Sequence, residues 1–139
     1  ENERMHLMIF IEIAKPNTFE RYLILFAQAV FWHFYFLLYV FFPKIAHRMV
    51  GYFEEQAVVS YTQYLEEIDS GLIENIPAPT TAIEYYGLSA SATLRDVVVR
   101  VREDEKGHMD ENHAMADLLV ITRGEPLGNT PRQPDSFHS

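Results

Sequence analysis

Residues 3–6 read Glu3-Arg4-Met5-His6 and residues 105–108 read Glu105-Lys106-Gly107-His108, so the chain carries Glu-x-x-His near its start and again near its end. On a helix, residues three apart lie on one face, so each copy presents a carboxylate and an imidazole to the same point. A single copy of this motif is more often part of a solvated helix face than of a metal site. Two copies with further inward carboxylates are typical of four-helix bundles that hold two metal ions.

The composition limits what such a helical protein can be. With 139 residues, 48% of them hydrophobic, the chain can bury one core and is best interpreted as one domain. A net charge of -9 argues against a nucleic-acid partner. The chain has no cysteine, so any metal must be held by oxygen and nitrogen ligands. We expect a helical domain over residues 1–124 and an irregular polar tail over residues 125–139.

The first part of the chain predicts two helices. Residues 1–14 show helical spacing of apolar residues, and residues 17–20 (Asn-Thr-Phe-Glu) form a capping sequence for a second helix. Residues 22–42 then contain no formally charged residue and ten aromatic ones. Their length approaches a membrane span of about 20 residues, although Gln28 and His33 interrupt it. The rings and the basic residues at both ends suit a helix at the bilayer interface.

The remaining sequence predicts three more helices. Residues 45–68 form the third, and Gly71 is its expected C-terminal stop. Thr81-x-x-Glu84 and Thr93-x-x-Asp96 resemble capping boxes that open a short helix and a long one, the long one ending at about Arg123. No strand pattern competes with these helices, so the predicted fold class is all-α.

A third carboxylate and two flanking polar residues complete the predicted metal site. Glu54, Ala57 and Tyr61 share one helix face, with small residues between the carboxylate and the phenol. Oxygen and imidazole ligands without thiolate suit iron or manganese. Asn2 and Asp104 each precede a Glu-x-x-His directly, and we expect them to orient the imidazoles. The other histidines, including His47, are given no ligand role.

Several blocks of sequence carry a family resemblance. Residues 2–7 read Asn-Glu-Arg-Met-His-Leu, residues 51–62 read Gly-Tyr-Phe-Glu-Glu-Gln-Ala-Val-Val-Ser-Tyr-Thr, and residues 102–108 read Arg-Glu-Asp-Glu-Lys-Gly-His. With these blocks the chain resembles the alternative oxidases, the di-iron, cyanide-insensitive quinol oxidases of respiratory membranes. The resemblance extends from residue 1 to about residue 125. One departure is Tyr86, which stands where the family more often has tryptophan.

The resemblance implies a role for each matching residue. The iron-ligating glutamates would be Glu3, Glu54 and Glu105, and His6 and His108 would ligate iron or hydrogen-bond to its ligands. Tyr61 matches the family's redox-active tyrosine. Ala57 and Ser60 match positions that line the quinol pocket. A further ligand helix is expected upstream of Glu1, so the ferritin-like di-iron four-helix bundle is incomplete in this chain.

The implied activity is a membrane-bound ubiquinol oxidase. Two ubiquinols would supply four electrons, and a centre of two iron ions would reduce dioxygen to water without proton pumping. The protein would be monotopic, lying on one leaflet of a bacterial cytoplasmic membrane or of the mitochondrial inner membrane. The sequence leaves a homodimer open.

Other functions remain compatible with the same residues. A plastid-type plastoquinol terminal oxidase or a di-iron hydroxylase would share the bundle and differ in substrate. A non-catalytic helical protein that only binds membranes would use these carboxylates as surface charge. Iron content of the full-length protein separates this last alternative from the enzymes, because only the enzymes require about two irons per chain.

Overall fold

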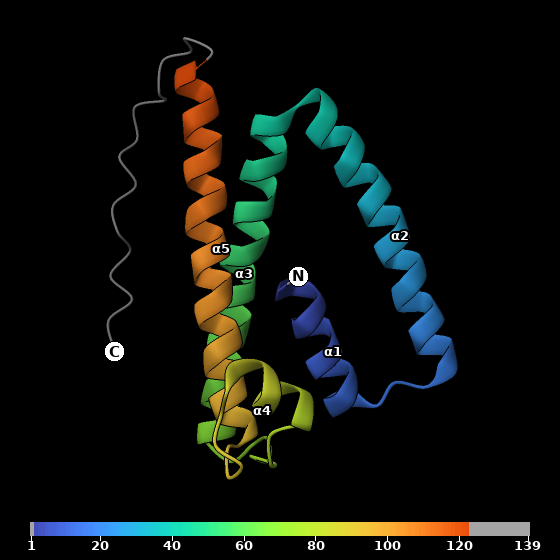
Figure 1. Ribbon diagram of the computed structural model, residues 1–139, viewed down its shortest axis with the longest axis vertical. Helices are drawn as coiled ribbons and strands as arrows, with labels where there is room; N and C mark the ends of the chain where they lie inside the picture. Colours follow the sequence, from blue (N-terminus) through green and yellow to red (C-terminus); the bar gives the residue numbers. More distant parts are fainter. Residues whose placement is uncertain (1, 123–139) are drawn as a thin grey trace.

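The computed structural model describes residues 2–122 of the chain, and these residues form five helices (Figure 1). They are listed here in chain order: α1 (Asn2–Ala14), α2 (Thr18–Phe41), α3 (Pro43–Asp69), α4 (Thr80–Tyr86) and α5 (Leu94–Thr122). Within residues 2–122 the β-type pairing is a single isolated bridge between Pro77 and Thr93. The all-α prediction is therefore confirmed for this part of the chain, and the expected tail at 125–139 lies outside it.

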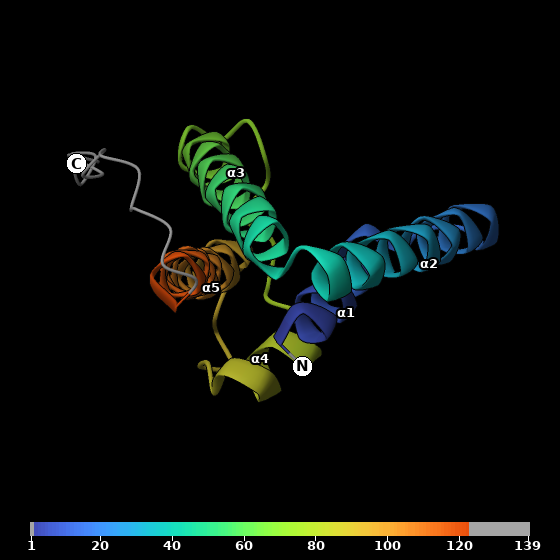
Figure 2. The same ribbon diagram turned by 90° about the horizontal axis from the view of Figure 1, so that it is seen from above.

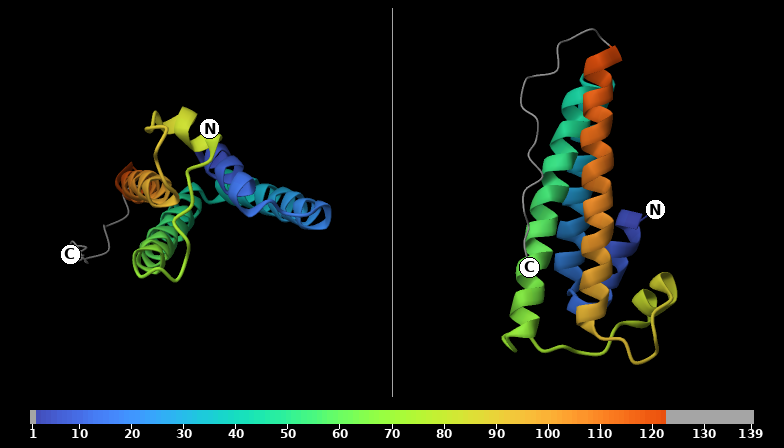
Figure 3. Two further views of the ribbon diagram at one scale, coloured as in Figure 1. Left: turned by 90° about the horizontal axis from the view of Figure 1, so that it is seen from below. Right: turned by 90° about the vertical axis from the view of Figure 1, so that its left-hand side faces the viewer.

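The two longest helices, α3 and α5, lie side by side along most of their length (Figures 1 and 3). They run antiparallel, since Asp69 at the end of α3 pairs with Arg95 at the start of α5. Leu65 and Ile68 of α3 pack with Leu94 and Val98 of α5 in one buried cluster. The pair forms the scaffold on which the other helices are placed.

A second buried cluster attaches α1 and α4 to a neighbouring face of α5. Ile9 of α1 and Ala82 of α4 pack with Val97 and Val101 of α5, and all four side chains are fully buried. Val97 and Val101 are four residues apart, so they lie on one helix face. The next position at that spacing is Glu105, and the same face therefore carries a carboxylate one turn further along α5.

Helix α2 projects away from the rest of the molecule (Figure 2). The predicted capping box is confirmed, because Asn17 Oδ1 accepts from the Glu20 backbone N–H at 3.0 Å and Glu20 Oε2 accepts from the Asn17 N–H at 2.8 Å. None of its residues is buried, and large side chains such as Phe26 and Trp32 are more than 60% exposed. By length and composition alone, α2 could cross a membrane.

The local signals around α4 and α5 were predicted with mixed success. Gly71 has a φ of +76°, consistent with the expected stop after α3. Asp96 Oδ2 accepts from the Thr93 backbone N–H at 2.8 Å, as the capping pattern before α5 predicts. The capping box predicted at Thr81 is wrong: the N-terminal cap of α4 is Pro79, two residues earlier, and the Thr81 hydroxyl donates instead to Glu12 Oε2 of α1 at 2.5 Å.

Candidate metal centre

The two Glu-x-x-His motifs face each other across α1 and α5. Because α1 runs antiparallel to α5, the contact that begins at Ile9 and Val101 continues one turn further to His6 and Glu105. Glu105 is 5% exposed and His6 is 4% exposed, so both polar side chains are buried beside the apolar cluster. Buried polar groups of this kind need hydrogen-bond partners, and each motif supplies them to the other.

The pairing is reciprocal. His108 Nδ1 lies 2.9 Å from Glu3 Oε1, and His6 Nδ1 lies 3.1 Å from Glu105 Oε1. The carboxylate of each motif therefore meets the imidazole of the other, and Glu3 Oε2 also lies 3.9 Å from His6 Nδ1 of its own motif. This arrangement gathers two carboxylates and two imidazoles between two helices, as the doubled pattern predicts for facing helices.

Three of these side chains already form a set that fits a metal ion. Glu3, Glu105 and His108 each offer one ligand atom, and the three atoms lie within 4.8 Å of one another. Oxygen and imidazole nitrogen without sulfur suit iron or manganese rather than a thiolate-bound metal. The donor set of the described residues therefore fits the implied group.

His6 lies beside this set and is held by acidic partners. Its Nδ1 faces Glu105, and its Nε2 lies 3.1 Å from Asp104 Oδ2. Burial lowers the pKa of His6, but the hydrogen bonds to Glu105 and Asp104 outweigh it, so the pKa is raised. Ionised Glu105 and Asp104 only accept hydrogen bonds, so the two contacts favour an imidazole that donates from both ring nitrogens.

Glu54 approaches the site from α3. It is half-buried, and it lies outside the set of three whose ligand atoms are within 4.8 Å. Burial raises the pKa of Glu54 to about 7, the hydrogen bond from Asn112 opposes that rise, and the charges of Glu105 and Glu3 add to it. Glu54 therefore shares its electrostatic environment with the other two glutamates.

The two polar residues that precede the motifs contact the opposite motif. Asn2 Nδ2 lies 3.4 Å from His108 Nε2, and Asp104 Oδ2 lies 3.1 Å from His6 Nε2. The sequence predicts that Asn2 and Asp104 each orient an imidazole, but it does not show whether that imidazole is His6 or His108. Because the contacts cross between α1 and α5, each helix orients the imidazole of the other.

Two adjacent tyrosines of α4 support these polar residues, and sequence reasoning missed both contacts. The Tyr86 hydroxyl donates to Asp104 Oδ2 at 2.7 Å, and the Tyr85 hydroxyl donates to Asn2 Oδ1 at 3.1 Å. Burial of Asp104 favours a higher pKa, but hydrogen bonds from Tyr86 and His6 lower the pKa of this carboxyl below its usual range. The only signal in the sequence was at Tyr86, which stands where the family more often has tryptophan.

The residues matched to the redox tyrosine and the quinol pocket lie on α3. Tyr61 is half-buried and stacks on Phe10 of α1, with ring centroids 5.7 Å apart. Burial raises the pKa of Tyr61 to about 12, so its phenol is neutral at physiological pH. Ala57 is half-buried, whereas Ser60 is exposed and its hydroxyl donates to the Gln56 carbonyl at 2.9 Å.

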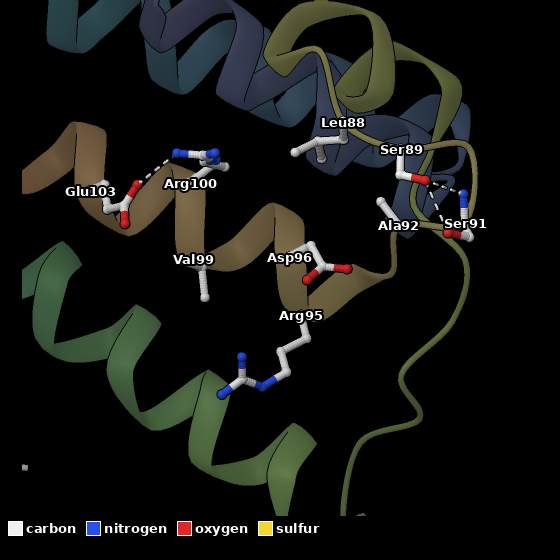
Figure 4. Close-up of a pocket in the computed structure, with 9 residues that line it drawn as sticks. All are labelled: Leu88, Ser89, Ser91, Ala92, Arg95, Asp96, Val99, Arg100 and Glu103. Carbon is white, nitrogen blue, oxygen red and sulfur yellow. Dashed lines mark hydrogen bonds and ion pairs between the residues drawn. The ribbon is translucent and has the colours of Figure 1, made fainter.

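Among residues 2–122, two of the open surface hollows have no lining from Ala57 or Ser60. One, of about 550 Å³, adjoins the metal set and is lined by Glu3, Gln28, Ala29, Phe31, Trp32 and Tyr35. The other, of about 490 Å³, lies at the start of α5 (Figure 4). There Arg100 pairs with Glu103 at 3.2 Å and Arg95 pairs with Asp69 at 2.6 Å, so both arginines of this hollow have a carboxylate partner.

Several known proteins are similar to this chain in sequence. Residues 1–117 match the family described as alternative oxidase. The mitochondrial ubiquinol oxidase 1a of Arabidopsis thaliana is 58% identical over 99% of this chain and 38% of its own length. The mitochondrial ubiquinol oxidase of Mangifera indica is 51% identical over 99% of this chain and 42% of its own length. The mitochondrial ubiquinol oxidase of Batrachochytrium dendrobatidis is 54% identical over 87% of this chain and 38% of its own length. The chain thus spans about two fifths of the length of these curated relatives.

Proposed function

The chain belongs to the alternative oxidase family, and from this premise we propose that the full-length protein oxidises ubiquinol and reduces dioxygen to water at a centre of two iron ions. The observation that supports this most is the reciprocal pairing of Glu3 with His108 and of His6 with Glu105. Relatives that match over nearly the whole chain are named ubiquinol oxidases. The proposed reaction pumps no protons across the membrane.

The proposed ligands come from three helices. Glu3 of α1 and Glu105 and His108 of α5 would hold iron, and Glu54 would approach from α3. When bound, the iron centre would supply the redox chemistry that couples quinol oxidation to dioxygen reduction. His6 would keep the Glu105 carboxylate oriented, because Asp104 holds the other side of the imidazole.

The proposed roles of the remaining α3 residues follow from position. Tyr61 stands seven residues after Glu54, and its neutral phenol packs between α3 and α1. We assign it the redox-active role, in which a phenol gives up one electron and one proton. Ala57 and Ser60 are proposed to contact the quinol, with the exposed Ser60 hydroxyl as a hydrogen-bonding group.

The placement of α2 supports attachment to one leaflet. Its two ends continue into α1 and α3, and these two helices contact each other through Phe10 and Tyr61. A bilayer-crossing α2 could keep that contact only if α3, which carries Arg48, Glu54 and Glu55 before Tyr61, crossed back through the bilayer, and charged side chains there are costly. The exposed aromatic helix is therefore proposed to lie in the membrane interface.

The proposed location is the mitochondrial inner membrane, since the relatives are named mitochondrial. A homodimer, which the sequence left open, stays a prediction that the oligomeric state of the full-length protein would test.

The test uses the full-length protein in membranes. Ubiquinol-dependent oxygen uptake should persist in cyanide and should be abolished by Glu105→Ala. Glu103→Ala is the matched control, because Glu103 is an exposed glutamate of the same helix that pairs with Arg100. Full activity in Glu105→Ala would contradict the site. Two irons per chain without ubiquinol oxidation would contradict the substrate and favour the hydroxylase alternative.

A further inference from the structure

The Asn112 carboxamide lies between α3 and α5 and contacts both. Its Nδ2 is 3.3 Å from Glu54 Oε1, 3.2 Å from Glu54 Oε2 and 3.1 Å from the backbone oxygen of His108. Its Oδ1 is 2.9 Å from His47 Nδ1. One amide therefore touches the Glu54 carboxylate, the helical turn that carries His108, and a histidine of α3.

The chemistry of these partners fixes the direction of every hydrogen bond. The His108 backbone carbonyl only accepts, so the N–H₂ group of the Asn112 amide must be on the side that faces both His108 and Glu54. This leaves Oδ1 to accept from His47, whose Nδ1 must then carry a hydrogen. Both polar atoms of the Asn112 carboxamide therefore have hydrogen-bond partners, and these partners determine which way the amide is oriented.

The bridge connects elements that are separate in the sequence. His47 and Glu54 are seven residues apart, two turns of α3, so both face α5. On the far side of His47, the Tyr39 ring of α2 packs edge-on at 5.4 Å. A continuous line of contacts thus runs from α2 through His47 and Asn112 to Glu54.

We propose that Asn112 and His47 are positioning residues that hold the Glu54 carboxylate toward the metal set and fix its distance from His108. This inference rests on the proposed function, because it assigns Glu54 to the metal centre. Asn112 restrains the carboxylate directly, and His47 acts through Asn112. A carboxylate restrained in this way needs less reordering when the ion binds.

The first experiment measures iron release from the full-length holoenzyme to an excess of ferrous chelator. Asn112→Leu and His47→Leu should release iron about tenfold faster than the wild type, the size expected when a group behind a metal ligand is removed. His47→Asn should stay close to wild type, because its side-chain N–H₂ can replace the Nδ1–H donor. Equal release from wild type and Asn112→Leu, or equal impairment by His47→Asn and His47→Leu, would overturn the proposal.

Matched controls separate positioning from loss of fold. Asn75→Leu removes an amide whose Oδ1 accepts from the Arg95 backbone N–H away from the metal set. His33→Leu removes an exposed histidine of α2. Both controls should release iron at the wild-type rate. A rate in either control that matches the Asn112→Leu rate would assign the effect to the fold and overturn the positioning role.

A second measurement needs no iron. In the metal-free full-length protein, the stability losses of Asn112→Leu and Glu54→Leu should be non-additive, because each change removes the same hydrogen bonds. Additive losses would overturn the bridge. If the wild type binds no iron, the proposed function fails on that result, while the bridge is still decided by this cycle.

Discussion

Glu3 Oε1 lies 2.9 Å from His108 Nδ1, so the first turn of α1 and the middle of α5 are joined through a carboxylate and an imidazole. Glu105 offers an oxygen within 4.8 Å of both ligand atoms. Two carboxylates this close repel each other when no cation lies between them, and they attract a cation that does. The closeness of the Glu3 and Glu105 carboxylates therefore lowers stability without a metal ion and raises it when one is bound.

The first prediction concerns this balance. In the metal-free full-length protein, Glu3→Gln should be slightly more stable than the wild type, by at most ~1 kcal/mol because Glu3 is largely exposed. With ferrous ion added under anaerobic conditions, the wild type should gain more in Tm than Glu3→Gln, since the stabilisation by a bound ligand rises with the logarithm of its affinity. Thermal unfolding with and without iron measures both effects.

The control for this prediction is Glu84→Gln, an exposed glutamate on α4. It should leave both Tm values unchanged. An equal iron-induced gain in Glu3→Gln and the wild type would exclude Glu3 as a ligand.

A second prediction concerns the tyrosine that replaces the commoner tryptophan. Tyr86→Phe removes the hydroxyl that donates to Asp104, and a hydrogen bond to a charged group contributes roughly 1.5 to 3 kcal/mol. We expect a stability loss of that order and a lower ubiquinol oxidation rate, because Asp104 also holds His6. Tyr86→Trp should keep most of both, since the indole N–H can donate in place of the hydroxyl.

Tyr85→Phe serves as the parallel variant. The Tyr85 hydroxyl donates to Asn2 at 3.1 Å, but Tyr85 is exposed, so its loss should be smaller. Chemical denaturation and oxygen uptake measure the series. A Tyr86→Phe protein as stable and active as the wild type would show that the hydroxyl contributes nothing.

Local signals were predictable from the sequence, and contacts between distant elements were not. The capping box at Asn17 formed because both partners lie within one helical turn. The two Glu-x-x-His motifs were recognisable for the same reason. The Thr81 box failed because the Thr81 hydroxyl donates to Glu12 of α1, a competitor that local spacing does not show. Tertiary contact outweighed local preference there.

The contact between His47 and Asn112 depends on how α3 and α5 are aligned, and residue spacing within one helix carries no information on that alignment. Part of it is set where Gly51 meets His113: a Cβ on Gly51 would lie 2.7 Å from His113 Cε1. Such a contact is decided by packing along the whole interface. His47 therefore gave no sign in the sequence of a role near Glu54.

A third prediction concerns the start of α5 and its pH dependence. Hydrogen bonds from the Thr93 backbone N–H and the Thr93 hydroxyl lower the pKa of Asp96 below its usual 3.8. A carboxyl whose folded pKa is depressed contributes stability above its unfolded pKa, and that stability is lost as the pH falls through the folded pKa. Asp96→Asn should therefore cost about 0.5 to 1 kcal/mol at pH 7.

The difference between wild type and Asp96→Asn should shrink below about pH 4 as the wild-type carboxyl becomes protonated. Denaturation at pH 7 and at pH 3 measures it. Asp110→Asn, an exposed aspartate later in α5, should show no such pH-dependent difference. A gap of constant size at both pH values would contradict the capping role of Asp96.

A fourth prediction uses Trp32, the one tryptophan of this chain, as a reporter of membrane contact. The side chain is 61% exposed on α2, so insertion into zwitterionic vesicles should shift its fluorescence to shorter wavelength. Subtracting the Trp32→Phe spectrum isolates the signal in the full-length protein. An unchanged spectrum at saturating lipid would contradict the interfacial placement of α2.

Charge on α2 should weaken this contact. Leu25→Glu should lower vesicle partitioning roughly tenfold or more. The change removes an exposed leucine from the apolar area that the membrane would cover, and it adds a charge there. Leu72→Glu, at a leucine that is 75% exposed after α3, is the control and should partition like the wild type. Equal partitioning of the two variants would place the contact elsewhere.

The crossed contacts of Asn2 with His108 and of Asp104 with His6 bear on the order in which a ribosome releases the chain. When α1 emerges, it presents one carboxylate and one imidazole without the groups that orient them. Those groups arrive only with α5, at the other end of the described chain. With the proposed ligands, a nascent or truncated chain would therefore offer iron an unfinished set until translation has passed α5.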